Sequence, residues 1–155
     1  MAIKGLASLR RKLKRLPQLA EEEISKAMEL SANEIVALMK NLAPVESGDL
    51  AASIGWTWGD APKGSMVIGK VRSKGRGAGN LTITIYAGDG EAYHARFVEF
   101  GTSPFTNGGL FAGSENPGTV AQPFFYPAYR ANRKRAKGRI TRAINKAAKR
   151  AAAGG

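Results

Sequence analysis

The sequence predicts an α+β domain in which a long N-terminal helix packs on a small curved antiparallel sheet of about four strands, followed by a long loop and a basic C-terminal helix. Three observations predict this order. Apolar side chains recur at helical spacing in residues 24–42, short β-prone runs lie between residues 56 and 100, and residues 130–150 are rich in Lys and Arg. The length is sufficient for a single domain covering residues 1–155.

The first long helix is expected between Pro17 and Pro44, after a short amphipathic segment. Proline suits the first turn of a helix because its missing N–H would have no partner there. Acidic residues at 21–23 then lie near the positive end of the helix dipole, and the residue before Pro44 is pushed out of the helical region. The apolar face of this helix comprises Ile24, Met28, Ile35, Leu38, Met39 and Leu42.

Strands are expected in the runs that follow this helix. Residues 56–58 are β-prone, residues 66–71 form an apolar run, and residues 81–86 alternate between apolar and polar side chains. The glycine-rich basic loop at 73–80 is expected to be a hairpin tip. A fourth run, residues 93–100, carries aromatic and branched side chains that suit a strand or a short helix.

Residues 102–122 form a long segment with little periodicity. Loops of this length in a small domain are commonly functional or are ordered by a neighbouring molecule. The C-terminal helix that follows has a narrow apolar stripe, so we expect it to bind its own core weakly and another chain to complete its contacts. The stripe consists of Ala131, Ile140, Ile144, Ala147 and Ala148.

Positive charge is concentrated at the two ends of the chain. The formal net charge is +12, from 24 basic and 12 acidic residues. Residues 1–16 hold six basic side chains and residues 130–150 hold ten, with no acidic residue in either stretch. Two interpretations stay open for the basic helical segments at 1–16 and 130–155. They face a polyanion or an acidic protein surface, or they are simply solvated.

The sequence offers no catalytic or metal-binding constellation, so we predict no enzyme, no metal and no cofactor. The chain has no cysteine, and its single histidine, His94, has no second histidine with which to bind a metal. Asp89, Glu91 and Glu99 could converge, but nothing in the pattern supports paired-acid hydrolysis. The loop at 73–80 lacks the Walker pattern, although its charge could contact a DNA backbone.

No stretch approaches the ~18 apolar residues that span a bilayer, so no membrane partner is expected. The basic N-terminus lacks the apolar core of a secretory signal, which predicts synthesis and assembly in a cytoplasm. Several aromatic residues could stack on nucleic-acid bases, but they alternate with aliphatic residues rather than with Lys or Arg, which favours core packing. They are Trp56, Trp58, Phe97, Phe100, Phe124 and Phe125.

Three segments resemble, in order and spacing, the motifs of one known family. The first is similar to P-V-x-T-G-x-L-x-x-S-I, with Ser47 in place of threonine, and matches at Pro44, Val45, Gly48, Leu50, Ser53 and Ile54. The second is similar to a signature that ends in V-E-F-G-T, and comprises Tyr93, Val98, Glu99, Phe100, Gly101 and Thr102. The third is similar to P-F-x-x-P-A and matches at Pro123, Phe124 and Pro127.

These motifs resemble those of the siphophage minor tail, or tail-completion, neck proteins, which also occur in prophages and gene-transfer particles. The resemblance implies a structural virion protein with no catalytic residues and no cofactor. It further implies a ring, usually of six subunits, that encircles the DNA channel in the neck. Such a ring joins the tail tube to the tail terminator or head-closure protein and can contact packaged DNA without sequence specificity.

The motif residues also have physical interpretations. Gly48 lies where a turn is needed and reaches positive φ without penalty. Leu50 and Ile54, four residues apart, can dock one helical turn on the core. Gly101 ends the fourth run, and Pro127 can start the last helix.

A closed ring needs a head-to-tail contact, so two different faces of one chain must match. We assign this contact to the aromatic loop around Phe105 and Phe111 and to the basic terminal helices, because neither is expected to bury itself within one subunit. The basic residues in this hypothesis are Arg130, Arg133, Arg135, Arg139 and Arg142.

Two alternatives stay open. A tail terminator or head-closure protein would share the neck location and the ring geometry. A cytoplasmic nucleic-acid-binding protein would explain the charge, although no recognised binding motif is present. A steep fall of DNA affinity with salt, by a chain that stays monomeric, would favour the second alternative.

Overall fold

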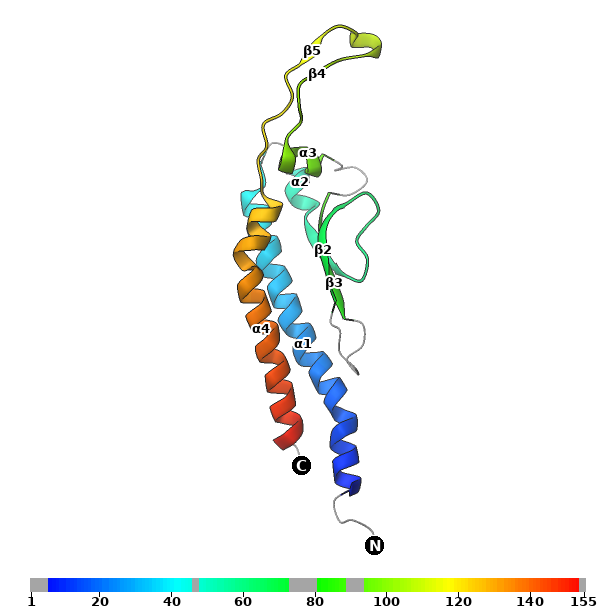
Figure 1. Cartoon of the computed structure of the whole chain (residues 1–155), viewed down its shortest axis with the longest axis vertical. Coiled ribbons are helices and arrows are strands. Elements are labelled where there is room, and N and C mark those ends of the chain that lie inside the picture. Colours follow the sequence, from blue (N-terminus) through cyan, green and yellow to red (C-terminus); the bar gives the residue numbers. More distant parts are fainter. Residues whose placement is uncertain (1–5, 46–47, 73–80, 89–93, 154–155) are drawn as a thin grey trace.

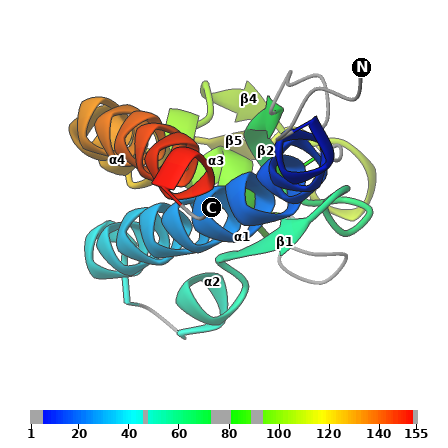
Figure 2. The ribbon, with the colours of Figure 1, turned by 90° about the horizontal axis from the view of Figure 1, so that it is seen from below.

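The computed structural model describes residues 6–45, 48–72, 81–88 and 94–153. Two long helices dominate it, α1 (Leu6–Leu42) and α4 (Phe125–Ala153). The two helices pack antiparallel and side by side, so the two ends of the chain lie at the same end of the molecule (Figure 1; Figure 2). No helix in the described ranges is long and apolar enough to cross a bilayer.

Between the long helices lie a short helix, a sheet and a second short helix. Their bounds are α2 (Asp49–Ala52), β1 (Gly55–Trp58), β2 (Met66–Arg72), β3 (Thr82–Ala87) and α3 (Ala95–Phe100). The sheet is antiparallel with the order β1-β3-β2. Its pairing shifts between Val67 and Lys70, which is an irregularity of the kind that bends a strand.

The core lies between α1, the sheet and the start of α4. Ile83, Ile85 and Ala87 alternate along β3 and are buried, as the two-residue period of a strand requires. Leu50 and Ile54 are buried as expected. The remaining large core side chains are Ile24, Met28, Ile35, Met39, Phe124 and Phe125.

The expected α+β architecture is confirmed, with differences in three elements. The first helix is continuous through Pro17 and starts at Leu6, so proline does not mark its beginning. The fourth run contains the helix α3, so the described sheet has three strands. The last helix starts at Phe125, two residues before Pro127.

The predicted apolar faces are partly wrong at the ends of the long helices. Leu42 is exposed at the end of α1, beyond the part covered by the sheet. On α4, Ile140 packs against the core and Ala147 is buried. The other members of the predicted stripe are exposed: Ala131, Ile144 and Ala148. The helix nevertheless packs on α1 within one chain, because small residues allow a close approach. The buried ones are Ala128, Ala143 and Ala147.

The segment expected to be a long loop is a hairpin, which we call the arm (residues 102–122). It contains β4 (Phe105–Thr106), a short 3-10 helix (Gly109–Phe111) and β5 (Glu115–Asn116). Figure 1 shows the arm projecting from the end of the molecule opposite the two termini. Some predictions concern residues that the structure does not describe: the loop at 73–80, Asp89, Glu91 and Tyr93. The basic side chains of residues 1–16 also lie outside what the structure describes.

The aromatic residues divide into two groups. Phe124 and Phe125 are fully buried, and Trp56 packs against the core while its Nε1 donates a hydrogen bond to Asn33 Oδ1 at 2.7 Å. Core packing is therefore confirmed for these three. The other three, Trp58, Phe97 and Phe100, are partly exposed, so the prediction that they pack in the core is wrong.

Candidate functional site

Glu99 joins α3 to the start of α4. Its side chain is only 3% exposed, and its carboxylate accepts hydrogen bonds from three backbone N–H groups. Oε2 accepts from Phe124 and Phe125 at 2.8 Å each, and Oε1 accepts from Tyr126 at 3.0 Å. We call this arrangement the Glu99 cap.

The Glu99 cap accounts for every N–H group that a helix start leaves without an intrahelical partner. A helix has four such groups, and a carboxylate there is also favoured by the helix dipole. In α4 the first three belong to Phe124, Phe125 and Tyr126, and the fourth position is Pro127, which has no N–H. The second and third sequence motifs are thus two parts of one hydrogen-bonded unit.

The arm leaves the body directly beside this cap. Gly101 has φ 70°, and a Cβ atom there would lie 2.5 Å from the carbonyl oxygen of Thr119. The backbones of Thr102 and Thr119 exchange hydrogen bonds of 3.0 and 3.2 Å, and Gln122 N–H donates to Val98 O at 2.8 Å. The two strands of the arm are therefore held together at their base, and the second strand is fixed to α3 of the body through Gln122.

The tip of the arm has its own hydrogen bonds. Asn107 N–H donates to Ser114 O at 2.8 Å, and Asn107 Nδ2 donates to Ser114 Oγ at 2.9 Å. Ser114 Oγ in turn donates to Phe111 O at 2.8 Å. Apolar side chains are nevertheless exposed along the arm: Leu110 is 100% exposed, Phe111 72% and Phe105 54%. The arm thus presents ordered apolar side chains that its own chain does not cover.

A groove of about 310 Å³ lies on the body between α1, β3 and α4. Its lining is mainly apolar, and Arg133 and Lys137 also contribute to it from α4. The apolar lining includes Met28, Ala32, Ile35, Ile83, Ile85 and Ile140.

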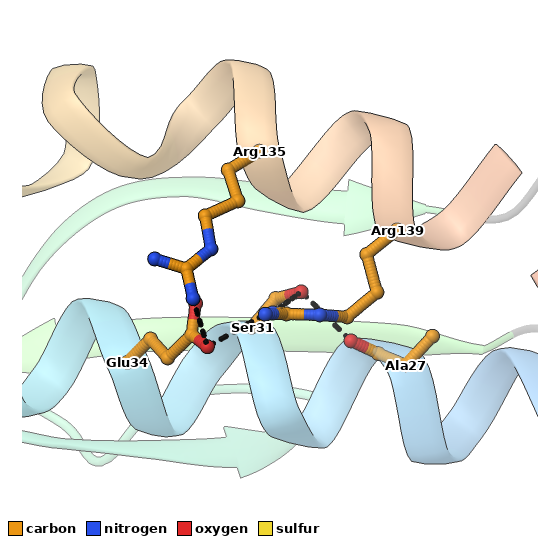
Figure 3. Close-up of polar contacts among 5 residues, drawn as sticks. All are labelled: Ala27, Ser31, Glu34, Arg135 and Arg139. Atoms are coloured by element: carbon orange, nitrogen blue, oxygen red, sulfur yellow. Dashed lines mark hydrogen bonds and ion pairs between the residues drawn. The ribbon is translucent and has the colours of Figure 1, made fainter. Parts of the chain in front are cut away.

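Several cations of α4 are used within the chain to hold the two long helices together. Arg135 and Arg139 pair with Glu34 of α1 at 3.1 and 2.6 Å (Figure 3). Arg139 also donates to Ser31 Oγ at 2.9 Å, and that hydroxyl donates to Ala27 O at 2.7 Å. The hydrogen bond from Arg139 lowers the pKa of Glu34.

A second set of pairs lies nearer the C-terminal end of α4. Lys146 pairs with Glu23 of α1 at 3.3 Å, and Arg150 pairs with the other oxygen of the same carboxylate. The hydrogen bond from Lys146, with the charge of Arg150 beside it, lowers the pKa of Glu23. Ion pairs with α1 therefore recur along α4, and they supplement its thin apolar stripe.

Other cations of α4 make no ion pair with the residues that the structure describes. Arg130, Arg133, Lys134 and Lys137 are exposed and spaced i, i+3, i+4 and i+7, which places them on one face of the helix. We call this set the basic stripe. Arg142 is likewise exposed and unpaired within the described part of the chain.

The residues of the interface hypothesis fall into two groups, those that are exposed without an ion pair and those that are paired within the chain. Phe105 and Phe111 lie on the arm, and Arg130 and Arg133 lie in the basic stripe. Arg135 and Arg139 are engaged with Glu34 inside the chain, which leaves them less available than the hypothesis assumed.

The first motif builds the turn between α1 and the sheet. Gly48 has φ 85° at the start of α2, as its position in the turn required. Ser53 Oγ donates to Leu50 O at 2.8 Å and accepts from Gly88 N–H at 3.1 Å, so it connects α2 to the end of β3. Pro44 and Val45 lie on the surface in part, with Val45 strongly exposed.

Among the described residues, no three His, Cys, Asp or Glu side chains gather in a way that could hold a metal ion. His94 directly precedes α3 and is half-buried. Glu99, one of the three acids considered for hydrolysis, caps α4 instead.

One protein-family model matches the chain, over residues 7–101, which is more than half of its length. The family is described as "Bacteriophage HK97-gp10, putative tail-component". The matched region includes the first sequence motif and the second as far as Gly101, so the arm and α4 lie beyond it. No curated protein and no solved structure matches the chain.

Proposed function

The chain belongs to the HK97-gp10-like family of bacteriophage tail components, and from this premise we propose that it is a non-enzymatic structural subunit of the neck, where it completes the tail as a ring around the DNA channel. By resemblance, the ring has six subunits. Its neighbours are the tail tube on one side and a tail terminator or head-closure protein on the other, and its location is the virion.

The observation that carries this proposal is the arm. Four large apolar side chains on it are more than half exposed, although hydrogen bonds order the hairpin and Gln122 N–H ties its base to Val98 O of the body. An ordered apolar projection is typical of a surface that another protein covers, since exposed apolar area favours association. A subunit of an assembly has such a surface, and a protein that works alone has no use for it.

The proposal is tested by adding the purified chain to assembled tails that lack it. Stoichiometric binding at the head-proximal end of the tail, seen by electron microscopy, is the expected result. Binding elsewhere along the tail would contradict the neck location and leave the tail-component family unchanged. Absence of any binding to tails would overturn the proposal.

A second candidate function is supported by the basic stripe. Four exposed cations on one face of α4 could neutralise phosphates of DNA, either inside the channel of the ring or as a free nucleic-acid-binding protein. Neutralising about four phosphates predicts that log K falls with log[salt] with a slope of about −3.6. Substituting Lys134 and Lys137 by Gln is expected to reduce that slope by about 0.9 per residue. Tight binding to DNA without any binding to tails would favour this function over the first.

A further inference from the structure

We propose that the tip of the arm of one copy inserts into the groove between α1, β3 and α4 of the next copy. This inference rests on the proposed function, and it names the partner of the arm as a second copy of the same chain. The contact is between two different faces, as a head-to-tail ring requires.

The arm supplies the projecting side of this contact. Leu110 and Phe111 lie in the short helix at its tip, where Leu110 is fully exposed and Phe111 is 72% exposed. The hydrogen bonds between Asn107 and Ser114 hold this tip in one shape. A tip that is already ordered loses little conformational freedom on binding, which favours insertion into a recess.

The groove supplies the receiving side. Its volume of about 310 Å³ is at the lower end of the ~300–1,000 Å³ of small ligand pockets, which suits one or two large apolar side chains. Ile35, Ile83 and Ile85 line it, and they belong to the core that continues beneath it. An inserted side chain would therefore extend an existing hydrophobic core.

The charges near the two sides are complementary. The only charged side chain of the arm is Glu115 in β5, which is exposed. The groove has Arg133 and Lys137 in its lining, and no acidic residue lines it. Like the other two members of the basic stripe, these two cations make no ion pair with the described residues, so they are available to the carboxylate of a neighbouring arm.

The arm cannot fill the groove of its own chain. The Thr102–Thr119 bridge holds the two strands of its base together, and Gln122 N–H fixes this base to Val98 O beside the Glu99 cap. Figure 1 shows it extending from that base away from the α1–α4 pair. The described part of the chain therefore carries an apolar projection and an apolar recess that do not meet within one copy.

The absence of cysteine allows a direct test. Particles are assembled from a mixture of two variants, Leu110→Cys and Ala136→Cys, and are then oxidised. Ala136 lines the groove. A disulfide needs Cα atoms within about 7 Å, so a mixed disulfide between the two variants is expected to form at least about tenfold more than in the control.

The matched control replaces Ala136→Cys by Ala131→Cys. Ala131 belongs to the same helix and is exposed, but it does not line the groove. Equal cross-linking of residues 110–136 and 110–131 would overturn the inference, because it would mean random collision. Cross-linking of Cys at position 110 to a different tail protein, in place of position 136, would overturn the inference too.

A second pair of variants tests the groove by filling it. Ala136→Trp is expected to reduce incorporation into particles at least about tenfold, since overpacking excludes the incoming tip. Ala131→Trp is expected to incorporate normally, and thermal unfolding checks that both variants fold. Normal incorporation of Ala136→Trp would overturn the inference and leave the proposed function intact. If the unsubstituted chain is absent from particles, both fail together.

Discussion

The base of the arm is held by hydrogen bonds within the chain, whereas the tip of the arm exposes apolar side chains to solvent. At its base, Glu99 and the Thr102–Thr119 bridge engage the backbone, and the carboxylate is almost fully buried. At its tip, Leu110 and Phe111 face solvent. The base therefore serves the fold of one chain, whereas the tip has a surface that only another molecule can cover. Substitutions at the base should change stability, and substitutions at the tip should change assembly.

The largest expected loss of stability is for Glu99→Ala. Removing the carboxylate leaves three backbone N–H groups at the start of α4 without an acceptor. Each buried unsatisfied donor costs about 1–3 kcal/mol, so with three of them the free energy of unfolding should fall by about 3 kcal/mol or more. Urea unfolding measures it, with Glu115→Ala on the exposed arm as a control that should change by less than about 0.5 kcal/mol.

Gly101→Ala should come second. An added Cβ would meet the carbonyl oxygen of Thr119 at 2.5 Å, and the φ of 70° is unfavourable for alanine. A loss of about 1–3 kcal/mol is expected from the same urea titration. Gly108→Ala is the matched control within the arm, because φ there is −105° and nothing lies within 4 Å of the added atom. Equal effects of the two substitutions would contradict a fixed base.

Acid should weaken the pairing of the long helices. The pKa of Glu34 is lowered from 4.5 by the hydrogen bond from Arg139. A carboxylate with a lowered folded-state pKa contributes stability that is present above its unfolded pKa and lost as pH falls through the folded value. Glu34→Gln should therefore flatten the fall of the melting temperature below pH ~4.5, by less than the Gly101→Ala effect. Glu22→Gln, at an exposed position of α1 with no ion pair among the described residues, is the matched control, and the difference between the two variants measures the contribution of the Glu34 pairs.

The smallest effect on stability is expected for Leu110→Asp. The side chain is completely exposed, so the free energy of unfolding should change by less than about 0.5 kcal/mol. Incorporation into particles should nevertheless be lost, as quantified by the amount of the chain in purified particles. If Leu110→Asp were both stable and fully incorporated into particles, the tip would not be needed for assembly, and the contrast between a base that stabilises the fold and a tip that serves assembly would be wrong.

The sequence predicted the elements that have strong periodicity. Ile24, Met28, Ile35 and Met39 recur at helical spacing and are buried, and residues 81–86 alternate and form most of β3. The arm was missed as a hairpin because β4 and β5 have two residues each, which is too short for an alternating pattern. Its exposed phenylalanines, Phe105 and Phe111, were nevertheless identified.

The contacts that the sequence did not reveal join distant residues. Glu99 was noted as a motif residue, but its partners begin 25 positions later, and local spacing carries no sign of a cap supplied from so far away. The only available signal was an acid within an aromatic run, followed by a later segment with two prolines. The packing of α4 on α1 was underestimated for the same reason, because Glu34 lies 101 positions from Arg135.

The Glu99 cap also has a mechanical consequence. The arm, α3 and the first turn of α4 meet at one carboxylate and its neighbouring hydrogen bonds. A force applied at the tip is therefore transmitted into the backbone at the start of α4 and along that helix, which is itself tied to α1 by ion pairs. Such a subunit would pass a load applied at its tip into the part of the helical pair that these ion pairs join.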